Sequence, residues 1–362
     1  MYIIDAHLDL AWNALQWNRN LQQSAYTIRT QESHLADAGR GRGTVAFPEM
    51  RKGNIALCFA TLLARSTGRA KPNIDYLSPI QAYATAQGQL AYYHALNDTD
   101  DVHIIKNLKE LNEHTTAWDD WDKDTSLPQP RIGLVVSMES ADPILKPDQL
   151  SAWMEAGVRI IGPAHYGSGR YAGGTSTEHG LTPDGLVLLR EMDHRRIILD
   201  LTHLSDKAFW QALETFDGVL IASHNNCRSL VPHQRQFDDE QIRVIVERYG
   251  VIGVAFDSWM LVPNWVRGGK ENPHVTLEHV ADQIDHICQL ASDSRHVAIG
   301  SDLDGGFGRE QSPSDLDTIA DLQKLIPRLA HRGYTEEDIS SIMHGNWLRL
   351  LRSAWALKEN AG

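Results

Sequence analysis

The sequence is short of the features that mark several common protein classes. It has three cysteines, Cys58, Cys227 and Cys288, which lie far apart and form no CxxC pair. A disulfide framework or a thiolate zinc site is therefore not expected. No apolar run approaches the roughly 18 residues that a membrane span needs, and the N-terminus has neither a basic segment nor a cleavable apolar stretch. We expect a soluble, cytoplasmic protein without membrane association.

Positive charge is also scarce. Lys and Arg number 34 against 47 Asp and Glu, so the net charge is −13 with histidines neutral. This balance argues against a protein that binds the phosphates of nucleic acid. Two catalytic motifs are missing as well. The GxSxG of serine hydrolases does not occur, and the glycine-rich GRGRGT at residues 39–44 lacks the GK[ST] of a phosphate-binding loop. We interpret residues 39–44 as a flexible loop.

Hydrophobic residues are plentiful, at 42% of the 362 residues, and they form short apolar runs between longer segments of helical period. Eight runs have the length of a strand and begin at Tyr2, Asn54, Arg131, Gly157, Arg196, Gly218, Gly250 and Arg295. Thr182, Ser205 and Thr335 have the residue types of helix N-caps. This alternation predicts an α/β fold, a (β/α)8 TIM barrel in a single domain over residues 1–362, with a doubly wound sheet as the alternative.

Two segments exceed what a minimal barrel needs. One covers residues 13–53, after the first strand. The other precedes the third strand, where AWDDWDKDTSLPQP at residues 117–130 is acidic, aromatic and ended by proline. We interpret both as insertions and favour solvated loops, with lids or an oligomer contact as the alternative.

The first strand has an ionisable residue at every second position, in the order Asp5, His7 and Asp9. Alternate side chains of a strand share a face, so these three are expected on one side and the apolar residues between them on the other. Ionisable groups on a buried strand need solvent, an ion pair or a metal as a partner.

The C-terminal ends of the strands are where a barrel carries its active site. The ends of six of these runs supply the candidate residues, which are His7 with Asp9, Glu139, His165, His203, His224 and Asp302. Each has an ordinary explanation when taken alone, and for Asp302 and Asp304 in GSDLDGG a turn would suffice. Their convergence on one barrel end indicates a divalent metal centre. Histidines and carboxylates without a thiolate suit Zn²⁺, with Mn²⁺ or Co²⁺ as alternatives.

Six segments carry a resemblance to a known family. In order they are DAHLD, SMESADP, GLTPDGLVLLREMDHRRIILDLTHLS, SHNNCRSLVPHQRQFDDEQI, GSDLDGG and HGNWLRLL. They resemble the membrane (renal-type) dipeptidases, peptidase family M19 of the amidohydrolase superfamily. The resemblance covers the first dozen residues and most of the chain from residue 133 onward. The chain departs from the family's DGHNDLP at Ala6, Leu8 and Ala11, and carries YGSGRYAGGTST after His165.

The resemblance implies a role for each candidate residue. His7 and Asp9 bind one zinc ion, His203 and His224 bind a second, and Glu139 bridges the two. His165 contacts the substrate carbonyl, Arg235 holds a substrate carboxylate, and Asp302 moves the proton. The resemblance also implies a (β/α)8 barrel, a homodimer, and dipeptide substrates, some with a D-residue at the C-terminal side. The expected nucleophile is a hydroxide held between the two metal ions.

Alternatives remain for one residue and for the function. Spacing alone favours a surface ion pair between Arg235 and Asp238 or Asp239, whereas the family motif favours substrate binding. The first rival function is a binuclear-metal amidohydrolase that acts on an N-acyl amino acid, a cyclic amide or a lactone. The second is a catalytically inactive metal-binding or scaffold protein, which the loss of a ligand or of Asp302 would favour. No such residue is lost.

Overall fold

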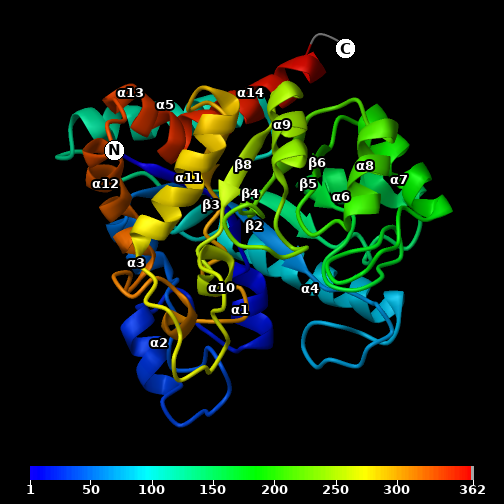
Figure 1. The fold of residues 1–362 in the computed structure, drawn as a ribbon, viewed down its shortest axis with the longest axis horizontal. Coiled ribbons are helices and arrows are strands. Elements are labelled where there is room, and N and C mark those ends of the chain that lie inside the picture. Colours follow the sequence, from blue (N-terminus) through cyan, green and yellow to red (C-terminus); the bar gives the residue numbers. More distant parts are fainter. Residues whose placement is uncertain (360–362) are drawn as a thin grey trace.

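The structure, a computed structural model, describes residues 1–359, and strands alternate with helices along this part of the chain (Figure 1). Its nine strands are β1 (Ile3–Leu8), β2 (Ile55–Leu63), β3 (Val102–Ile104), β4 (Ile132–Glu139), β5 (Val158–Gly162), β6 (Ile198–Asp200), β7 (Leu220–Ala222), β8 (Val251–Val254) and β9 (Val297–Ile299). All strand pairings in the described residues are parallel.

The helices lie between and around these strands. The α-helices are α1 (Leu10–Gln16), α2 (Ala25–Gln31), α3 (Phe47–Lys52), α4 (Pro79–Asn97), α5 (Leu108–Lys123), α6 (Leu150–Glu155), α7 (Pro183–His194), α8 (Asp206–Thr215), α9 (Asp239–Glu247), α10 (Ser258–Leu261), α11 (Leu277–Ala291), α12 (Leu325–His331), α13 (Glu336–Ser340) and α14 (Asn346–Glu359). Short 3-10 segments are η1 (Pro147–Gln149), η2 (Arg309–Gln311) and η3 (Ile319–Lys324), and η4 (Ser341–Gly345) is a π-helical turn.

The sheet closes on itself. Hydrogen-bonded neighbours run in the order β2, β1, β9, β8, β7, β6, β5 and β4, and β2 pairs in turn with β4 from Leu57 to Leu63. The predicted eight-stranded barrel is therefore confirmed, and the doubly wound alternative, which needs an open sheet, is wrong. β3 is an additional strand that pairs with the first residues of β4. β3 was not predicted from the sequence because its three residues are too few to show a strand pattern.

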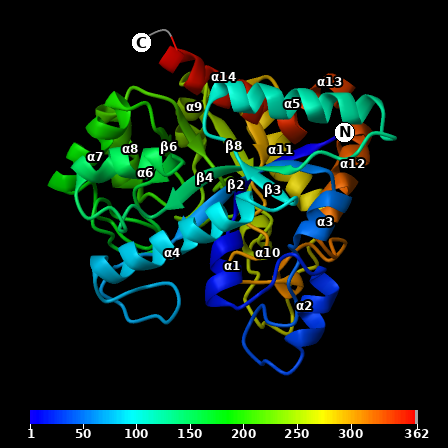
Figure 2. The ribbon, with the colours of Figure 1, turned by 180° about the vertical axis from the view of Figure 1, so that it is seen from behind.

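One end of the barrel is covered by the C-terminal part of the described chain. Trp347 of α14 is fully buried in a cluster with Ile4 and Ile160, and its indole Nε1 donates to the carbonyl of Ile299 at 2.9 Å. Figure 2 shows α14 and α5 lying across this end. The loops that follow the strands, together with α1 and α10, lie at the opposite end (Figure 1). Binding sites of barrels lie at that opposite end.

Parts of both insertions fold into helices, which corrects the preference for solvated loops there, whereas residues 124–130 form a loop without helix or strand. Residues 13–53 contain α2 and α3, and their Ile28, Phe47 and Met50 are buried. The acidic, aromatic segment begins inside α5, where Trp118 is fully buried and donates from Nε1 to the carbonyl of Arg131 at 3.1 Å. These apolar side chains are packed against the barrel, because burying them gains free energy that a solvated loop would forgo.

The predictions of a loop at residues 39–44 and of three N-caps are confirmed, and the flexibility of the loop stays a prediction. Residues 39–44 contain neither helix nor strand. The side chains of Thr182, Ser205 and Thr335 accept hydrogen bonds from backbone amides in the first turns of α7, α8 and α13. These caps satisfy donors that the start of each helix leaves without a partner.

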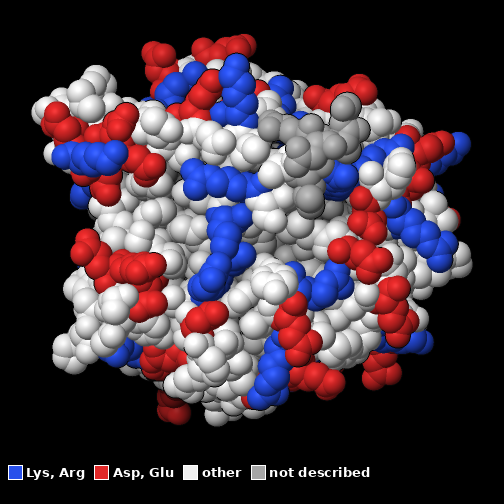
Figure 3. Space-filling model, turned by 90° about the horizontal axis from the view of Figure 1, so that it is seen from above, with Lys and Arg blue, Asp and Glu red and all other residues white. Residues whose placement is uncertain are grey.

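The surface on the α14 side carries interspersed acidic and basic side chains (Figure 3). Within residues 1–359, none of the helices has both the length and the apolar character required to cross a bilayer. The cytoplasmic location and the homodimer stay predictions.

Candidate active site

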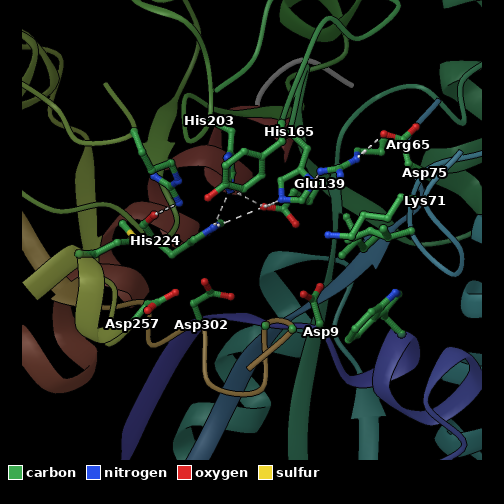
Figure 4. Close-up of a pocket in the computed structure, with 18 of the residues that line it drawn as sticks. Asp9, Arg65, Lys71, Asp75, Glu139, His165, His203, His224, Asp257 and Asp302 are labelled. Atoms are coloured by element: carbon green, nitrogen blue, oxygen red, sulfur yellow. Dashed lines mark hydrogen bonds and ion pairs between the residues drawn. The ribbon is translucent and has the colours of Figure 1, made fainter. Parts of the chain in front are cut away.

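The C-terminal ends of the barrel strands bring the predicted residues to one cavity of about 420 Å³ (Figure 4). Its lining includes Asp9, Glu139, His165, His203, His224, Arg235 and Asp302. His7 lies against this group, with its Nε2 3.8 Å from oxygens of Asp9, Glu139 and Asp302. The structure therefore gathers all eight residues singled out in the sequence, and the cavity has the size of a small-molecule site.

Glu139 stands at the centre of this group, at the end of β4. Its Oε1 lies 3.1 Å from His203 Nε2 and 3.3 Å from His224 Nε2, and its Oε2 lies 3.8 Å from His7 Nε2. His7 is in turn paired with Asp9. Two sets of potential metal ligands thus share Glu139, one with His7 and Asp9 and the other with His203 and His224, and the ligand atoms of each set lie within 4.8 Å of one another.

Three atoms of this group are buried without a hydrogen-bond partner among the described residues. They are His7 Nε2, Asp9 Oδ1 and Glu139 Oε1. A buried polar atom without a partner costs about 1–3 kcal/mol, and more when it is charged. Divalent cations would satisfy all three atoms, and the mixture of imidazole nitrogens and carboxylate oxygens is a donor set that Zn²⁺ accepts. The residues present therefore fit a metal centre.

The imidazoles are oriented by hydroxyl groups. Nδ1 of His7 lies 3.4 Å from Thr61 Oγ1, Nδ1 of His203 lies 2.9 Å from Thr175 Oγ1, and Nδ1 of His224 lies 2.9 Å from Ser223 Oγ. A hydrogen bond from Nδ1–H fixes the tautomer in which Nε2 has a free lone pair. In all three residues the Nε2 atom faces Glu139.

The pKa values reflect crowded charges. Burial raises the pKa of Glu139 to about 7, although His7 opposes the shift. Burial lowers the pKa of His7, but the carboxylates of Glu139, Asp9 and Asp302 outweigh burial and raise the value to about 10. Burial lowers the pKa of His203 and of His224 well below its usual range. Both imidazoles are thus neutral, which is the form that binds metal ions.

His165 is held by a residue that the sequence analysis did not single out. Arg65 Nη1 lies 2.8 Å from His165 Nδ1, and Arg65 Nε donates to Asp75 at 2.9 Å. A guanidinium has no acceptor, so Nδ1 of His165 accepts and Nε2 carries the proton. That Nε2 lies 3.8 Å from Glu139 Oε1, toward the centre. The sequence did contain a sign of this role, because Arg65 lies two residues beyond the apolar run of β2, at the barrel end that carries the other site residues.

Asp257 is a second residue that was missed. It follows β8 and lines the same cavity, close to Asp302 in Figure 4. Both of its carboxylate oxygens accept from Gln311 Nε2 at 2.8 Å, and burial raises its pKa to about 7. The signal was present, because the run GVIGVAFD ends in this aspartate just as other runs end in His203 or His224.

Two of the predicted residues have a left-handed backbone, with φ of +67° at His203 and +57° at Asp302. Non-glycine residues in this conformation are strained and persist where surrounding structure holds them. Burial raises the pKa of Asp302 well above its usual range, against the opposing charge of His7. A carboxyl group with a raised pKa can hold a proton near neutral pH.

Arg235 is buried, with 3% of its surface exposed. Its Nη2 donates to the carbonyl of His224 at 2.8 Å and its Nη1 donates to Asn225, while Nε has no partner among the described residues. Within residues 1–359 it forms no ion pair, so the alternative of a surface pair with Asp238 or Asp239 is wrong. Arg235 also lines the cavity, so its guanidinium is the candidate group there for binding an anion.

Two acidic residues of the sequence motifs have structural partners instead. Asp5 accepts hydrogen bonds from the backbone N–H and the hydroxyl of Ser301, and Asp304 accepts from Arg19 and Thr44. The expected strict alternation along β1 also fails, because the β1–β2 register is irregular between Asp5 and Leu8. The irregularity separates the environment of Asp5 from that of His7.

A sequence model described as "Membrane dipeptidase (Peptidase family M19)" matches residues 1–361. The chain belongs to this peptidase family. The identification from the six sequence motifs is therefore confirmed, and it places the chain in a family of hydrolases.

Several proteins are similar to this member of family M19. The "Uncharacterized protein in pqqA 5'region" of Klebsiella pneumoniae is 32% identical over 214 residues, which cover 57% of this chain and 76% of that protein. Dipeptidase tcpJ of Claviceps purpurea is 30% identical over 203 residues, which cover 54% of this chain and 44% of that protein. The matched part spans about half the length of several curated relatives.

Solved structures show the same fold. Dipeptidase AC and a metallopeptidase of Rhodobacter sphaeroides, the latter liganded with a phosphinate mimic of the dipeptide L-Ala-D-Ala, each superpose with a TM-score of 0.75. Each has 23% sequence identity, and each match covers 98% of this chain and 99% of the other. The similarity extends over the whole barrel.

Proposed function

We propose that this chain is a binuclear metal-dependent dipeptidase, and that its ions are zinc. The observation that carries the proposal is the position of Glu139 between two ligand pairs, with buried atoms of His7, Asp9 and Glu139 lacking partners. His7 and Asp9 would hold one ion, His203 and His224 the other, and Glu139 would serve both. The names of dipeptidase relatives support this class of substrate. A homodimer is part of the same proposal.

The chain's own groups would perform the remaining chemistry. Divalent ions in such a centre acidify a water molecule and polarise a carbonyl. The Nε2–H of His165 would donate to the oxygen of the scissile carbonyl as that oxygen gains negative charge. Asp302 would accept a proton from the attacking water and deliver it to the nitrogen of the leaving amine. The C–N bond breaks, the new C–O bond forms, and the proton is conserved.

Arg235 would orient the substrate. Its buried Nε–H has no partner, and its two other nitrogens are fixed by His224 and Asn225. A fixed guanidinium with a free donor suits a carboxylate. A dipeptide presents such a carboxylate one residue beyond the scissile amide. The proposed substrates are therefore dipeptides with a free C-terminus, including some with a D-residue at that end.

The decisive experiment combines metal analysis with paired substrates. Elemental analysis should find about two divalent ions per chain. A dipeptide library should be tested with free and with C-terminally amidated members, using the wild type and Arg235→Ala. We expect Arg235→Ala to lower kcat/KM for free dipeptides by roughly 10–1000-fold and to affect amidated ones far less. Arg243→Ala, which removes an exposed guanidinium of α9, is the matched control.

Two outcomes would count against the proposal. Protein that carries no stoichiometric metal and gains no activity from added metal would contradict the metal centre. Equal cleavage of free and amidated substrates, with equal losses in Arg235→Ala, would contradict carboxylate recognition. The second result would favour the rival amidohydrolase that acts on an N-acyl amino acid, a cyclic amide or a lactone.

A further inference from the structure

The cavity has a wall of cationic side chains that the proposed mechanism does not use. Besides Arg235, its lining includes Arg65, Arg69, Lys71 and Arg267. Arg65 is paired with Asp75, at 2.9 Å. Within residues 1–359, the other three form no ion pair. Three cations without an ion pair are thus gathered around one cavity of a protein whose net charge is −13.

Arg69 and Lys71 lie in the loop between β2 and α4, whose backbone is ordered by hydrogen bonds. The amide of Arg65 donates to the carbonyl of Ile74 at 3.0 Å, and the amide of Asp75 donates to the carbonyl of Lys71 at 3.0 Å. Trp12 Nε1 of α1 also donates to a carbonyl of this loop, at Asn73, at 2.8 Å. The backbone that carries the two cations is thus held by hydrogen bonds within the loop and by one from Trp12 of α1.

The position of Lys71 relates it to the rest of the site. In Figure 4 its side chain enters the cavity from the side of Arg65 and Asp75, with the amino group directed toward the centre. His224 lies on the other side, with Glu139 between them. Arg235 is bonded to His224 and so belongs to that other side. In this view Lys71 and His224, whose carbonyl accepts from Arg235, therefore lie on opposite sides of Glu139.

The electrostatic surroundings of Lys71 leave its charge uncompensated. Burial lowers its pKa, and the positive charges of Arg65 and Arg267 lower it further, while Asp75 opposes these effects. The cavity lining contains five cationic and five carboxylate side chains, so divalent ions in the centre would make it net positive. A substrate with a single carboxylate, held by Arg235, leaves the Lys71 side without an anion. A second negative group on the substrate would relieve this repulsion.

We propose that Arg69 and Lys71 select dipeptides whose N-terminal residue carries an acidic side chain, so that the preferred substrates have carboxylates at both ends. This inference rests on the proposed dipeptidase function and specifies its substrate class. The C-terminal carboxylate is bound by Arg235, the scissile amide lies over Glu139, and the side-chain carboxylate of an N-terminal Asp or Glu lies against Lys71.

The test compares isosteric substrates. Wild-type enzyme, loaded with metal, is assayed with Glu-Ala, Gln-Ala and Lys-Ala. We expect kcat/KM for Glu-Ala to exceed that for Gln-Ala by about 10-fold or more, with Lys-Ala lowest, as one charge-assisted contact provides. The preference should shrink as salt is raised, because the loop is exposed and its charges are screened. In Lys71→Gln, and further in a variant that also has Arg69→Gln, the Glu-to-Gln ratio should fall toward one.

The matched control is Lys52→Gln. Lys52 is an exposed residue at the end of α3, before β2 begins, and lies outside the cavity lining. The Lys52→Gln variant should keep the wild-type ratio of kcat/KM for Glu-Ala to kcat/KM for Gln-Ala. Equal or better cleavage of Gln-Ala or Lys-Ala by the wild type would overturn the inference and leave the dipeptidase function standing. A preference for Glu-Ala that survives in both loop variants would overturn the assignment to Arg69 and Lys71. Cleavage of no dipeptide at all would instead overturn the proposed function, and this inference with it.

Discussion

At the scale of single residues, Asp302 has the environment of a proton carrier. Its carboxyl group lies 3.8 Å from His7 Nε2, and burial raises its pKa well above the usual range. We predict that Asp302→Asn keeps the shape of the side chain and loses the proton acceptor. Such groups typically contribute 10²–10⁴-fold to a rate. The variant should lose that much kcat in steady-state assays while its metal content and melting temperature stay close to those of the wild type. Turnover near the wild-type rate would remove Asp302 from the mechanism.

Asp257 gives a prediction about pH. Burial raises its pKa to about 7, so the folded protein keeps this proton at pH values where the unfolded chain, with an ordinary pKa near 4, has released it. Folding stability in the metal-free protein should therefore fall as pH rises from about 4 to 7, and then level off.

Asp257→Asn cannot ionise, so its stability relative to the wild type should increase across this window. The difference should reach about 4 kcal/mol at pH 8, because each of the roughly three pKa units of displacement is worth about 1.4 kcal/mol. Thermal or denaturant unfolding of both chelated proteins between pH 4 and 8 would measure it. A difference that is constant with pH would show that Asp257 ionises normally in the folded protein.

The roles of individual aspartates were the least predictable part of the site. Asp5 and Asp9 lie on the same short stretch, but Asp5 is satisfied by Ser301 whereas Asp9 Oδ1 has no partner. Ser301 is 296 positions away in the sequence. Likewise, Asp304 is held by Thr44, 260 positions away. A local pattern predicts which residues reach the end of a strand, but it carries no information about distant donors.

At the scale of elements, the eight barrel strands were predictable because strands such as β1, β2 and β4 are buried on both faces and so form continuous apolar runs. The polar residue that ends a run marks the barrel end, which is why most of the site could be predicted. α2 and α3 were not, since each is a short helix of six or seven residues. Their buried faces depend on contacts with the barrel that a short apolar pattern does not reveal.

Asp5 connects two elements and supports a prediction at this scale. Its carboxylate accepts from the backbone N–H and the hydroxyl of Ser301 and so joins β1 to the turn after β9. Asp5 precedes His7 by two residues. Asp5→Ala leaves the buried N–H of Ser301 without a partner, which costs about 1–3 kcal/mol. Denaturant unfolding should show this loss, and metal affinity should fall because His7 follows two residues later.

Ser301→Ala provides the complementary measurement, since it removes the hydroxyl and keeps the backbone donor. It should cost less than Asp5→Ala, and the double variant should lose less than the sum of the two single variants, as coupled groups do. Strictly additive losses would show that the two side chains act independently and that the β1–β9 connection has another origin.

At the scale of the whole molecule, the barrel gathers buried ionisable groups from distant parts of the sequence at one of its ends. Three buried polar atoms at the centre lack partners, and the pKa of Glu139 is raised to about 7 by burial. The folded chain has this arrangement at the end opposite α14, whereas an unfolded chain would disperse it. Metal ions should therefore bind the folded state in strong preference to the unfolded one, and stability should depend on metal concentration.

We predict that removing metal with a strong chelator lowers the melting temperature and abolishes activity, and that added Zn²⁺ restores both. A ligand present at 100 times its dissociation constant stabilises a folded protein by about 2.7 kcal/mol per site. The melting temperature should rise with free Zn²⁺ until about two ions per chain are bound, as measured by scanning calorimetry and elemental analysis. His203→Ala should show a smaller rise and a lower metal content because one ligand of the second ion is absent. His194→Ala, which removes an exposed histidine at the end of α7, should behave as the wild type. A melting temperature that does not respond to chelation or to Zn²⁺ would mean that the cluster around Glu139 is stable without a cation.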